Sequence, residues 1–240
     1  PYGTSILLSV FVILTFVNAF NLIDGIDGLA SGIGILGSLI LGIWFHFAGY
    51  VTFSILSFAL TGSLSGFFIF NVFGNKNKLF MGDTGSLVLG LIMATLVIKF
   101  NEFNISTIYP YSIESSPSVS FAIVSFPLID TLRVMTMRLS SGRSPFSPDK
   151  NHIHHRLLEL IPNHLSVTTI ILTANLFIIG LALFFNNLAF NVNLQFLLIF
   201  LTGILFSFIP SKILQWKKAR IRRKKKGLAM ESSGKFPDAS

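Results

Sequence analysis

The 240-residue chain is 52% hydrophobic, contains 26 phenylalanines and has only 12% charged residues, against about 25% in an average soluble domain. The apolar runs are too many for a signal peptide, so the composition excludes a soluble protein and predicts an all-α integral membrane protein. The chain has no cysteine, which excludes disulfides and thiolate metal sites.

A membrane-spanning helix needs about 20 mainly apolar residues. Seven segments come near this requirement, and the second and third are almost contiguous, which predicts a tight hairpin. The first and fourth are short. The predicted spans are Thr4–Phe20, Leu29–Gly49, Thr52–Val72, Gly85–Phe100, Val119–Met137, Val167–Phe185 and Leu194–Ile209.

The net charge of +8 is concentrated near the end of the chain, in the run KILQWKKARIRRKKK at 212–226. Directly after a hydrophobic span, such a run marks a cytoplasmic end that contacts anionic headgroups, rather than a nucleic-acid site. We therefore expect a polytopic membrane domain over residues 1–211 and a basic cytoplasmic tail over 212–240 that is partly disordered. Counting back through seven spans places the loops after spans one, three and five in the cytoplasm.

The first polar motif is NAFNLIDGIDGLASG, at 18–32, where a hydrophobic helix is expected to end. Asn18, Asn21, Asp24 and Asp27 recur every three residues, a spacing that keeps neighbouring side chains within reach on a helix. Helix capping and loop polarity offer one explanation. Carboxylates close to a bilayer are costly, however, and their presence favours a functional site.

The second motif, FMGDTGSL, is at 80–87 and places Asp83 between two glycines at the start of a span. Asp often caps a helix N-terminus. Capping and ligand binding are compatible here, because a helix N-terminus also attracts phosphate.

The third motif, PLIDTLRV at 127–134, sets Asp130 three residues before Arg133. This spacing allows the two charges to pair within the inner leaflet. A structural ion pair and a functional role remain equally open, because membrane helices also keep charges by pairing them.

The fourth motif, SPDKNHIHHRL, is at 147–157 in the longest cytoplasmic loop. His152, His154 and His155 suggest a zinc site, but cysteine partners are missing and the spacing is not that of a zinc finger. A clamp for anions, including Lys150 and Arg156, fits better. The leucines that follow predict a short interfacial helix that holds this loop against the membrane.

Taken together, the motifs offer hard oxygen ligands and cationic donors on one face of the membrane. Carboxylate and amide oxygens suit Mg²⁺, which usually shares its coordination shell with substrate phosphates. The cations would hold the remaining phosphate charge. This combination predicts transfer of a phosphoryl group at the cytoplasmic surface of the membrane.

The four motifs, in this order, resemble those of the polyprenyl-phosphate N-acetylhexosamine-1-phosphate transferases, the superfamily that includes MraY and WecA, and the last two resemble the WecA branch. The resemblance extends from about Val17 to Arg156. It implies transfer of a sugar 1-phosphate, GlcNAc 1-phosphate first, from a UDP-sugar to undecaprenyl phosphate. It further implies release of UMP, Mg²⁺ (or Mn²⁺) as cofactor and a bacterial inner-membrane location, and it leaves room for a homodimer.

By this resemblance each matching residue receives an expected role. Asn21 and Asp83 correspond to the metal-binding pair, and Asp24 corresponds to an essential catalytic carboxylate. Asp27 and Phe80 correspond to residues that bind uracil. His152, His154 and His155 are expected to contact the diphosphate and to be catalytic. Substrate binding is expected of Asn18, Lys150 and Arg156, and Asp83 is expected to be catalytic as well as metal-binding.

The chain departs from the family pattern in one respect, because it contains no adjacent Asp pair. Family members carry such a pair in an earlier loop, where it is associated with the lipid phosphate, and members of this branch have about four further spans upstream. The resemblance therefore predicts that this segment is the C-terminal part of the family fold and that by itself it lacks part of the lipid-phosphate site.

Two other functions fit parts of the pattern. A CDP-alcohol phosphotransferase also uses membrane carboxylates and Mg²⁺, but its signature places an AR pair after DG, whereas LASG follows DGIDG here. A transporter or scaffold for anionic lipid would place polar residues near mid-membrane, and only Asp130 is a candidate for that depth. The sugar and the glycan pathway stay undetermined at this stage.

Overall fold

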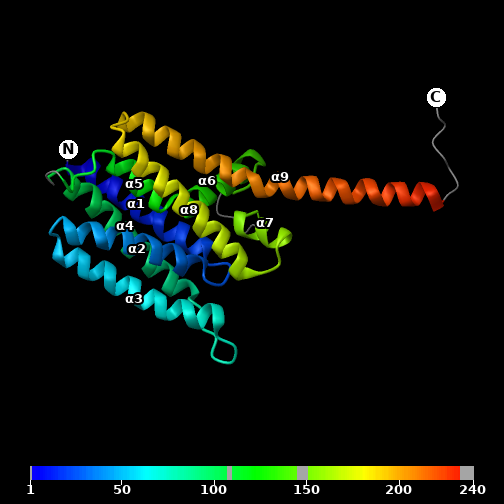
Figure 1. Cartoon of the computed structure of the whole chain (residues 1–240), viewed down its shortest axis with the longest axis horizontal. Helices are drawn as coiled ribbons and strands as arrows, with labels where there is room; N and C mark the ends of the chain where they lie inside the picture. Colours follow the sequence, from blue (N-terminus) through cyan, green and yellow to red (C-terminus); the bar gives the residue numbers. More distant parts are fainter. Residues whose placement is uncertain (1, 107–109, 145–150, 233–240) are drawn as a thin grey trace.

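The computed structural model describes residues 2–106, 110–144 and 151–232, and Figure 1 shows the arrangement of their helices. Within these ranges the regular secondary structure is α-helical. The helices are α1 (Tyr2–Ile23), α2 (Leu29–Phe47), α3 (Val51–Phe73), α4 (Gly82–Asn104), α5 (Ser116–Ile123), α6 (Ser125–Ser140), α7 (Ile153–Leu160), α8 (His164–Asn187) and α9 (Val192–Ser232).

Six of the described helices, namely α1, α2, α3, α4, α8 and α9, are each long and apolar enough to cross a membrane. Helices α5 and α6 meet the same test together but are bent by 76° at their junction, and they make a seventh span if the pair is counted as one. The chain is a multi-pass membrane protein, and the predicted all-α fold with about seven spans is confirmed.

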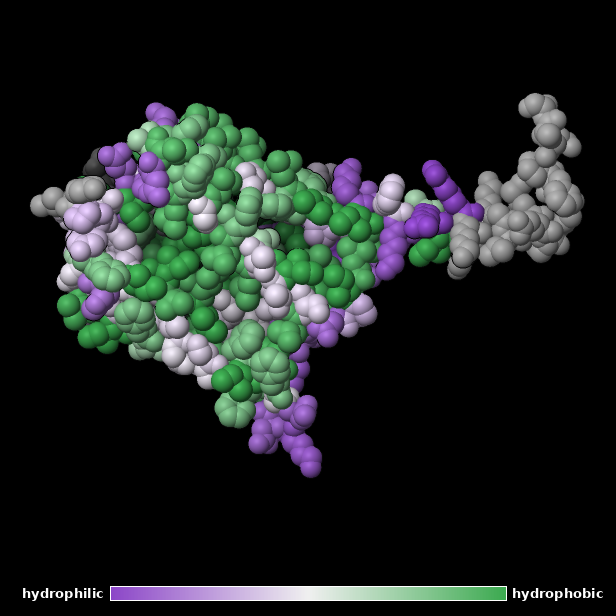
Figure 2. All heavy atoms as spheres, in the orientation of Figure 1, coloured by the Kyte–Doolittle hydropathy of each residue, from purple (hydrophilic) through white to green (hydrophobic). Residues whose placement is uncertain are grey.

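The consecutive helices α2 and α3 pack as a hairpin, whereas α1 lies against the sequence-distant α4 and α6. A buried core of large side chains, among them Phe20, Ile33 and Met93, joins these helices. Large apolar side chains also cover the outside, such as Leu7 and Phe11, and the space-filling view is mainly hydrophobic over the bundle (Figure 2). An apolar exterior of this extent is what a lipid solvent requires.

One end of the bundle collects the loops that carry the polar motifs. The α1–α2 loop, the α3–α4 connection and α7 lie at the end from which α9 extends, and the α2–α3 and α8–α9 turns lie at the other (Figure 1). The spans alternate in direction, as short loops between membrane helices require. The motifs predicted to share one membrane face therefore do lie at one end.

The bend between α5 and α6 replaces the single straight span predicted over Val119–Met137. A break in a membrane helix frees backbone groups that must be satisfied within the protein. The buried side chain of Asn175, on α8, supplies the partners: its Oδ1 accepts from the Phe126 N–H at 3.2 Å and the Ser125 hydroxyl at 2.9 Å, and its Nδ2 donates to the Ile123 carbonyl at 3.0 Å.

Three further boundaries differ from the sequence prediction. Helices α1 and α4 have 22 and 23 residues, so neither span is short. Helix α9 has 41 residues and continues from the last span through the basic run to Ser232 without a break at residue 211. The lysines and arginines of this run are good helix formers, which explains the continuity. Residues 233–240 lie outside the described part of the chain.

This arrangement predicts which positions share a side of the membrane. The chain has no cysteine, so single-cysteine variants give an unambiguous readout. Lys76→Cys and Ser144→Cys, at the motif end, should be labelled by an impermeant thiol reagent only when it reaches the α9 side. Glu114→Cys, at the other end, should be labelled only from the opposite side. Labelling of Lys76→Cys and Glu114→Cys from one side would contradict the fold.

Candidate active site

The last turn of α1 brings an amide from the first motif to the second motif. Asn21 Nδ2 donates to Asp83 Oδ1 at 3.2 Å and to the Ser86 hydroxyl at 3.0 Å, so α1 and the first turn of α4 meet through these side chains. Asp83 lies in the first turn of α4, and α4 has no side-chain cap. Its carboxylate therefore faces Asn21 and does not cap the helix. Asn18 instead donates to the Leu14 carbonyl at 2.7 Å, within its own helix.

The loop between α1 and α2 is held by side chains from two distant helices. Asn71, at the end of α3, accepts from the Gly28 N–H at 2.6 Å and donates to the Leu79 carbonyl at 2.8 Å. Thr168, on α8, donates to the Asp27 carbonyl at 2.8 Å. Gly28 has a φ of +77°, and a Cβ there would lie 2.7 Å from Phe68 and Val72 side chains, so only glycine fits this turn.

Asp24 is the carboxylate whose environment least favours its charge. Burial, together with the nearby charges of Asp83 and Asp27, raises the pKa of Asp24 to about 6. A carboxylate in this position gains free energy from any cation placed beside it. The geometry therefore concentrates uncompensated negative charge where the first two motifs meet.

Asp27 has cationic neighbours that the motif alone does not reveal. Its Oδ2 lies 2.7 Å from Lys78 Nζ and 2.8 Å from His164 Nδ1. The same Lys78 ammonium lies 5.4 Å from the ring centroid of Phe80, whose side chain is 75% exposed. These residues, with Asp24 and Asp83, line an open cavity of about 410 Å³. An exposed ring and a hydrogen-bonding carboxylate at its wall suit a planar heterocycle.

The third and fourth motifs form a single buried unit. Asp130, on α6, accepts from the Ile153 N–H at 2.8 Å and lies 2.9 Å from His152 Nδ1 and 3.8 Å from Arg133 Nη1. Arg133 in turn donates to the Asn151 carbonyl at 2.9 Å and to the Ser211 hydroxyl at 2.8 Å. The predicted Asp130–Arg133 pair is confirmed, and it fixes the start of α7 to both α6 and α9.

The three histidines occupy different environments. His152 is buried against Asp130, whereas His154 is fully buried, and neither of its ring nitrogens has a hydrogen-bond partner. A Cβ at Gly25 would lie 2.6 Å from His154 Nε2, so the imidazole packs directly beneath the Asp24–Asp27 loop. Burial lowers the pKa of His154 to about 3, against the opposing charge of Asp130, so this ring is neutral.

His155 and Arg156 complete the described part of the fourth motif. His155 is half-buried, and its ring centroid lies 4.3 Å from that of His154. Arg156 Nη2 donates to the Asn151 side chain. Lys150 falls among residues 145–150, outside the described ranges. The predicted interfacial helix corresponds to α7, which packs against α8 and α9.

The structure thus brings Asp24, Asp27, Asp83 and Phe80 to one cavity, with Asn21 hydrogen-bonded to Asp83 and His154 directly behind the loop. The sequence reasoning missed four contributors: Lys78, His164, Asn71 and Ser86. No local pattern marks His164 or Asn71, because each meets the loop only through tertiary packing.

The donor set at this junction fits a hard divalent cation. Asn21 and Asp83 place an amide and a carboxylate 3.2 Å apart, beside the electrostatically unfavourable Asp24. Among the described residues no three His, Cys, Asp or Glu side chains form a ready metal cage. An incomplete protein shell is normal for Mg²⁺, which keeps water or phosphate oxygens in its remaining positions.

Comparison with known proteins agrees with this geometry. The sequence model of glycosyl transferase family 4 matches residues 1–101, which include the first two motifs. This chain belongs to glycosyl transferase family 4. No solved structure matches the chain.

Several curated members of this family are similar to the chain. It is 32% identical over 160 residues to the undecaprenyl-phosphate alpha-N-acetylglucosaminyl 1-phosphate transferase of Escherichia coli (strain K12), covering 66% of the chain and 41% of the relative. It is 34% identical over 180 residues to the decaprenyl-phosphate N-acetylglucosaminephosphotransferase of Mycobacterium leprae, covering 70% and 45%. The chain spans less than half the length of these relatives.

The raised pKa of Asp24 predicts a pH-dependent stability difference. Because the folded-state pKa is about 6 and the ordinary value is 3.8, the neutral form stabilises the fold below pH 4, and this stability is lost as pH rises through 6. Asp24→Asn should therefore melt at a higher temperature than the native protein at pH 8 without divalent cations, with the difference vanishing near pH 4. An unchanged difference across this range would contradict the assignment.

The buried Asp130 unit predicts a large loss of stability on truncation. Asp130→Ala removes the buried carboxylate that faces Arg133 and His152 and accepts from the Ile153 N–H, and breaking a buried ion pair typically costs about 3–5 kcal/mol. Thermal unfolding in detergent should show a marked fall in melting temperature. Glu159→Gln is the matched control, because it breaks the exposed Glu159–Lys218 ion pair and should have little effect. Equal melting temperatures for the two variants would refute the anchoring role.

Proposed function

We propose that the complete protein transfers a sugar 1-phosphate, GlcNAc 1-phosphate first, from a UDP-sugar to a polyprenyl phosphate such as undecaprenyl phosphate and releases UMP. The observation that carries this proposal is a cavity whose wall presents Asp24, Asp27, Asp83 and Phe80, with Asn21 hydrogen-bonded to Asp83. The names of the similar family members support the same reaction and the same sugar.

Asn21 and Asp83 would hold Mg²⁺, with Mn²⁺ as the alternative, and Asp24 would contribute its charge nearby. When bound, the cation would supply electrostatic stabilisation of charge on the phosphate oxygens. The electrostatic strain at Asp24 supports this assignment, because a cation there would relieve the repulsion among three carboxylates. The amide and carboxylate oxygens involved are the ligands that such hard cations prefer.

The reaction is a substitution at phosphorus. An oxygen of the lipid phosphate forms a bond to the β-phosphorus of the UDP-sugar, and the bond from this phosphorus to the bridging oxygen breaks. The electron pair of that bond leaves with UMP. Preorganised donors around the diphosphate lower the barrier, because they meet the charge as it develops.

The chain's own side chains divide these tasks. Phe80 and Asp27 would hold the base at the cavity wall, with Lys78 and His164 fixing the carboxylate. His155 and Arg156 are only half-buried, whereas His152 is buried. The first two side chains are therefore better placed to reach a phosphate. His152 and His154 are buried, and they would position the loop and α7 from behind. Lys150 stays a candidate anion donor.

The proposed location is the cytoplasmic face of the bacterial inner membrane. The basic residues of α9 extend from the end of the bundle that carries the α1–α2 loop and the α3–α4 connection (Figures 1 and 2), and residues of these two segments line the cavity. Positive residues of membrane proteins collect on the cytoplasmic side, and nucleotide sugars would reach the cavity from there.

Asp83→Asn in the full-length protein tests the proposal. Loss of a metal-binding carboxylate should lower turnover by roughly 10²-fold or more, since metal stabilisation of developing charge is worth several kcal/mol. The measurement is UMP release from UDP-GlcNAc with undecaprenyl phosphate and Mg²⁺, using Glu159→Gln as the folded control. Near-native turnover at saturating Mg²⁺ would reject the ligand role.

The same assay separates the competing functions. Release of CMP from a CDP-alcohol in place of UMP would identify the other class of phosphotransferase. Absence of nucleotide release from every UDP-sugar tested with the full-length protein would favour a lipid transporter or scaffold. A panel of UDP-sugars in this assay would also identify the donor.

A further inference from the structure

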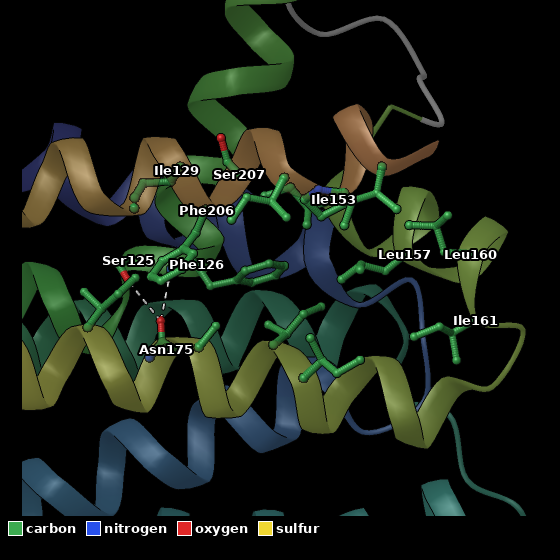
Figure 3. Close-up of a pocket in the computed structure, with 18 residues that line it drawn as sticks. Ser125, Phe126, Ile129, Ile153, Leu157, Leu160, Ile161, Asn175, Phe206 and Ser207 are labelled. Atoms are coloured by element: carbon green, nitrogen blue, oxygen red, sulfur yellow. Dashed lines mark hydrogen bonds between the residues drawn. The ribbon is translucent and has the colours of Figure 1, made fainter. Parts of the chain in front are cut away.

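A second, larger cavity of about 590 Å³ lies between α6, α7, α8 and α9 (Figure 3). Its wall is almost entirely aliphatic and aromatic. The polar side chains in the wall are already hydrogen-bonded within the protein: Ser125 to Asn175, and Ser207 to the Ile204 carbonyl. The polar side chains of the lining are therefore already engaged, and the ligand chemistry that the cavity fits is a hydrocarbon chain.

The cavity leads toward a basic stretch of α9. Ile213 lines the cavity and also a shallow hollow formed by Lys212, Gln215, Trp216 and Ala219. Trp216 is 82% exposed, and Lys212 is exposed beside it. An exposed Trp next to lysines is typical of the membrane interface, where the ring lies among headgroups and the ammonium attracts anionic lipid.

We propose that this cavity binds one acyl chain of an anionic phospholipid, with the lipid's phosphate held near Lys212 and Trp216. The apolar wall accounts for the chain, and the basic hollow that shares Ile213 accounts for the head. The two surfaces meet at Ile213, so one amphipathic molecule can occupy both. No residue of the 410 Å³ cavity at the candidate active site belongs to either surface.

The geometry also separates this occupant from a substrate lipid. An acceptor must bring its phosphate to the Asp24–Asp83 junction, whereas α7 stands between that junction and the hydrocarbon cavity. Ile153, Leu157 and Leu160 of α7 line the cavity, while His154 of the same helix packs against Gly25. The phospholipid therefore supports α7 from the side opposite the active site.

Occupancy should stabilise the position of the histidine motif, because a ligand that binds only the folded state favours that state by mass action. An influence of the bound phospholipid on sugar-phosphate transfer would rest on the proposed function. The binding of the phospholipid itself does not. A binding measurement can therefore fail or succeed independently of any activity assay.

The first experiment uses the native protein in vesicles of phosphatidylcholine that contain phosphatidylglycerol with a photoreactive diazirine in one acyl chain. After irradiation, peptide mapping should find adducts on cavity-lining residues of α8 and α9, such as Ala174 and Phe206. Adducts confined to outward-facing positions, such as Leu176 and Leu205, would overturn the proposal. Addition of undecaprenyl phosphate, at or above the concentration of the photoreactive phosphatidylglycerol, should leave the cavity adducts unchanged. Loss of these adducts would assign the cavity to the acceptor lipid and refute the proposal.

The second experiment compares variants by native mass spectrometry of retained phosphatidylglycerol. Ala174→Phe fills the cavity and should abolish retention, whereas Leu176→Phe, on the lipid-facing side of the same helix, should retain it. Lys212→Gln should weaken retention by about fivefold, and Lys217→Gln, outside the hollow, should not. Equal retention by Lys212→Gln and Lys217→Gln, or native retention by a folded Ala174→Phe, would refute the site.

Discussion

The candidate site depends on how a membrane protein satisfies backbone groups where its helices break. The α1–α2 loop exposes such groups at the end of the bundle, and Asn71 satisfies one of them by accepting from the Gly28 N–H. The same side chain donates to the Leu79 carbonyl in the α3–α4 connection. One buried amide thereby fixes the first motif and the connection before the second in a common frame. The α5–α6 bend uses the same device, with Asn175 in place of Asn71. An unsatisfied group at either break would cost several kcal/mol in hydrocarbon.

The fixed loop explains the electrostatics of the site. Asp24, Asp27 and Asp83 are held close together by covalent and hydrogen-bonded neighbours, so their charges cannot move apart. Asp27 is compensated by Lys78 and His164, which leaves Asp24 and Asp83 beside the amide of Asn21. A rigid site that retains excess negative charge is preorganised for a cation. The free energy needed to bring the carboxylates together is supplied by folding, so it does not weaken cation binding.

Neighbouring residues of the fourth motif occupy different environments. Asp130 fixes His152 and the first turn of α7, and α7 then presses the neutral ring of His154 against Gly25. These histidines therefore act as parts of the framework around the loop, while His155 and Arg156 remain nearer the surface. The burial of a charged pair is tolerated because Asp130 and Arg133 each make further hydrogen bonds.

The sequence by itself determined the membrane class, the approximate spans and the polar motifs that are proposed to form the site. Hydropathy and motif spacing are local properties, so the pattern was sufficient to predict that Asn21, Asp24, Asp27 and Asp83 lie at a helix end. The Asp130–Arg133 pair followed from a spacing of three residues. Its partners at the start of α7 did not, because they lie 22 and 23 residues further along the chain.

Only the tertiary structure decided which side chains complete the site. Lys78 and His164 reach Asp27 from 51 and 137 residues away, and the α5–α6 bend depends on an amide about 50 residues further along. Such contacts are set by which helix faces pack together, and no local spacing encodes them. For the same reason the sequence showed three histidines in one motif, whereas packing against Gly25 and Asp130 assigned them different surroundings.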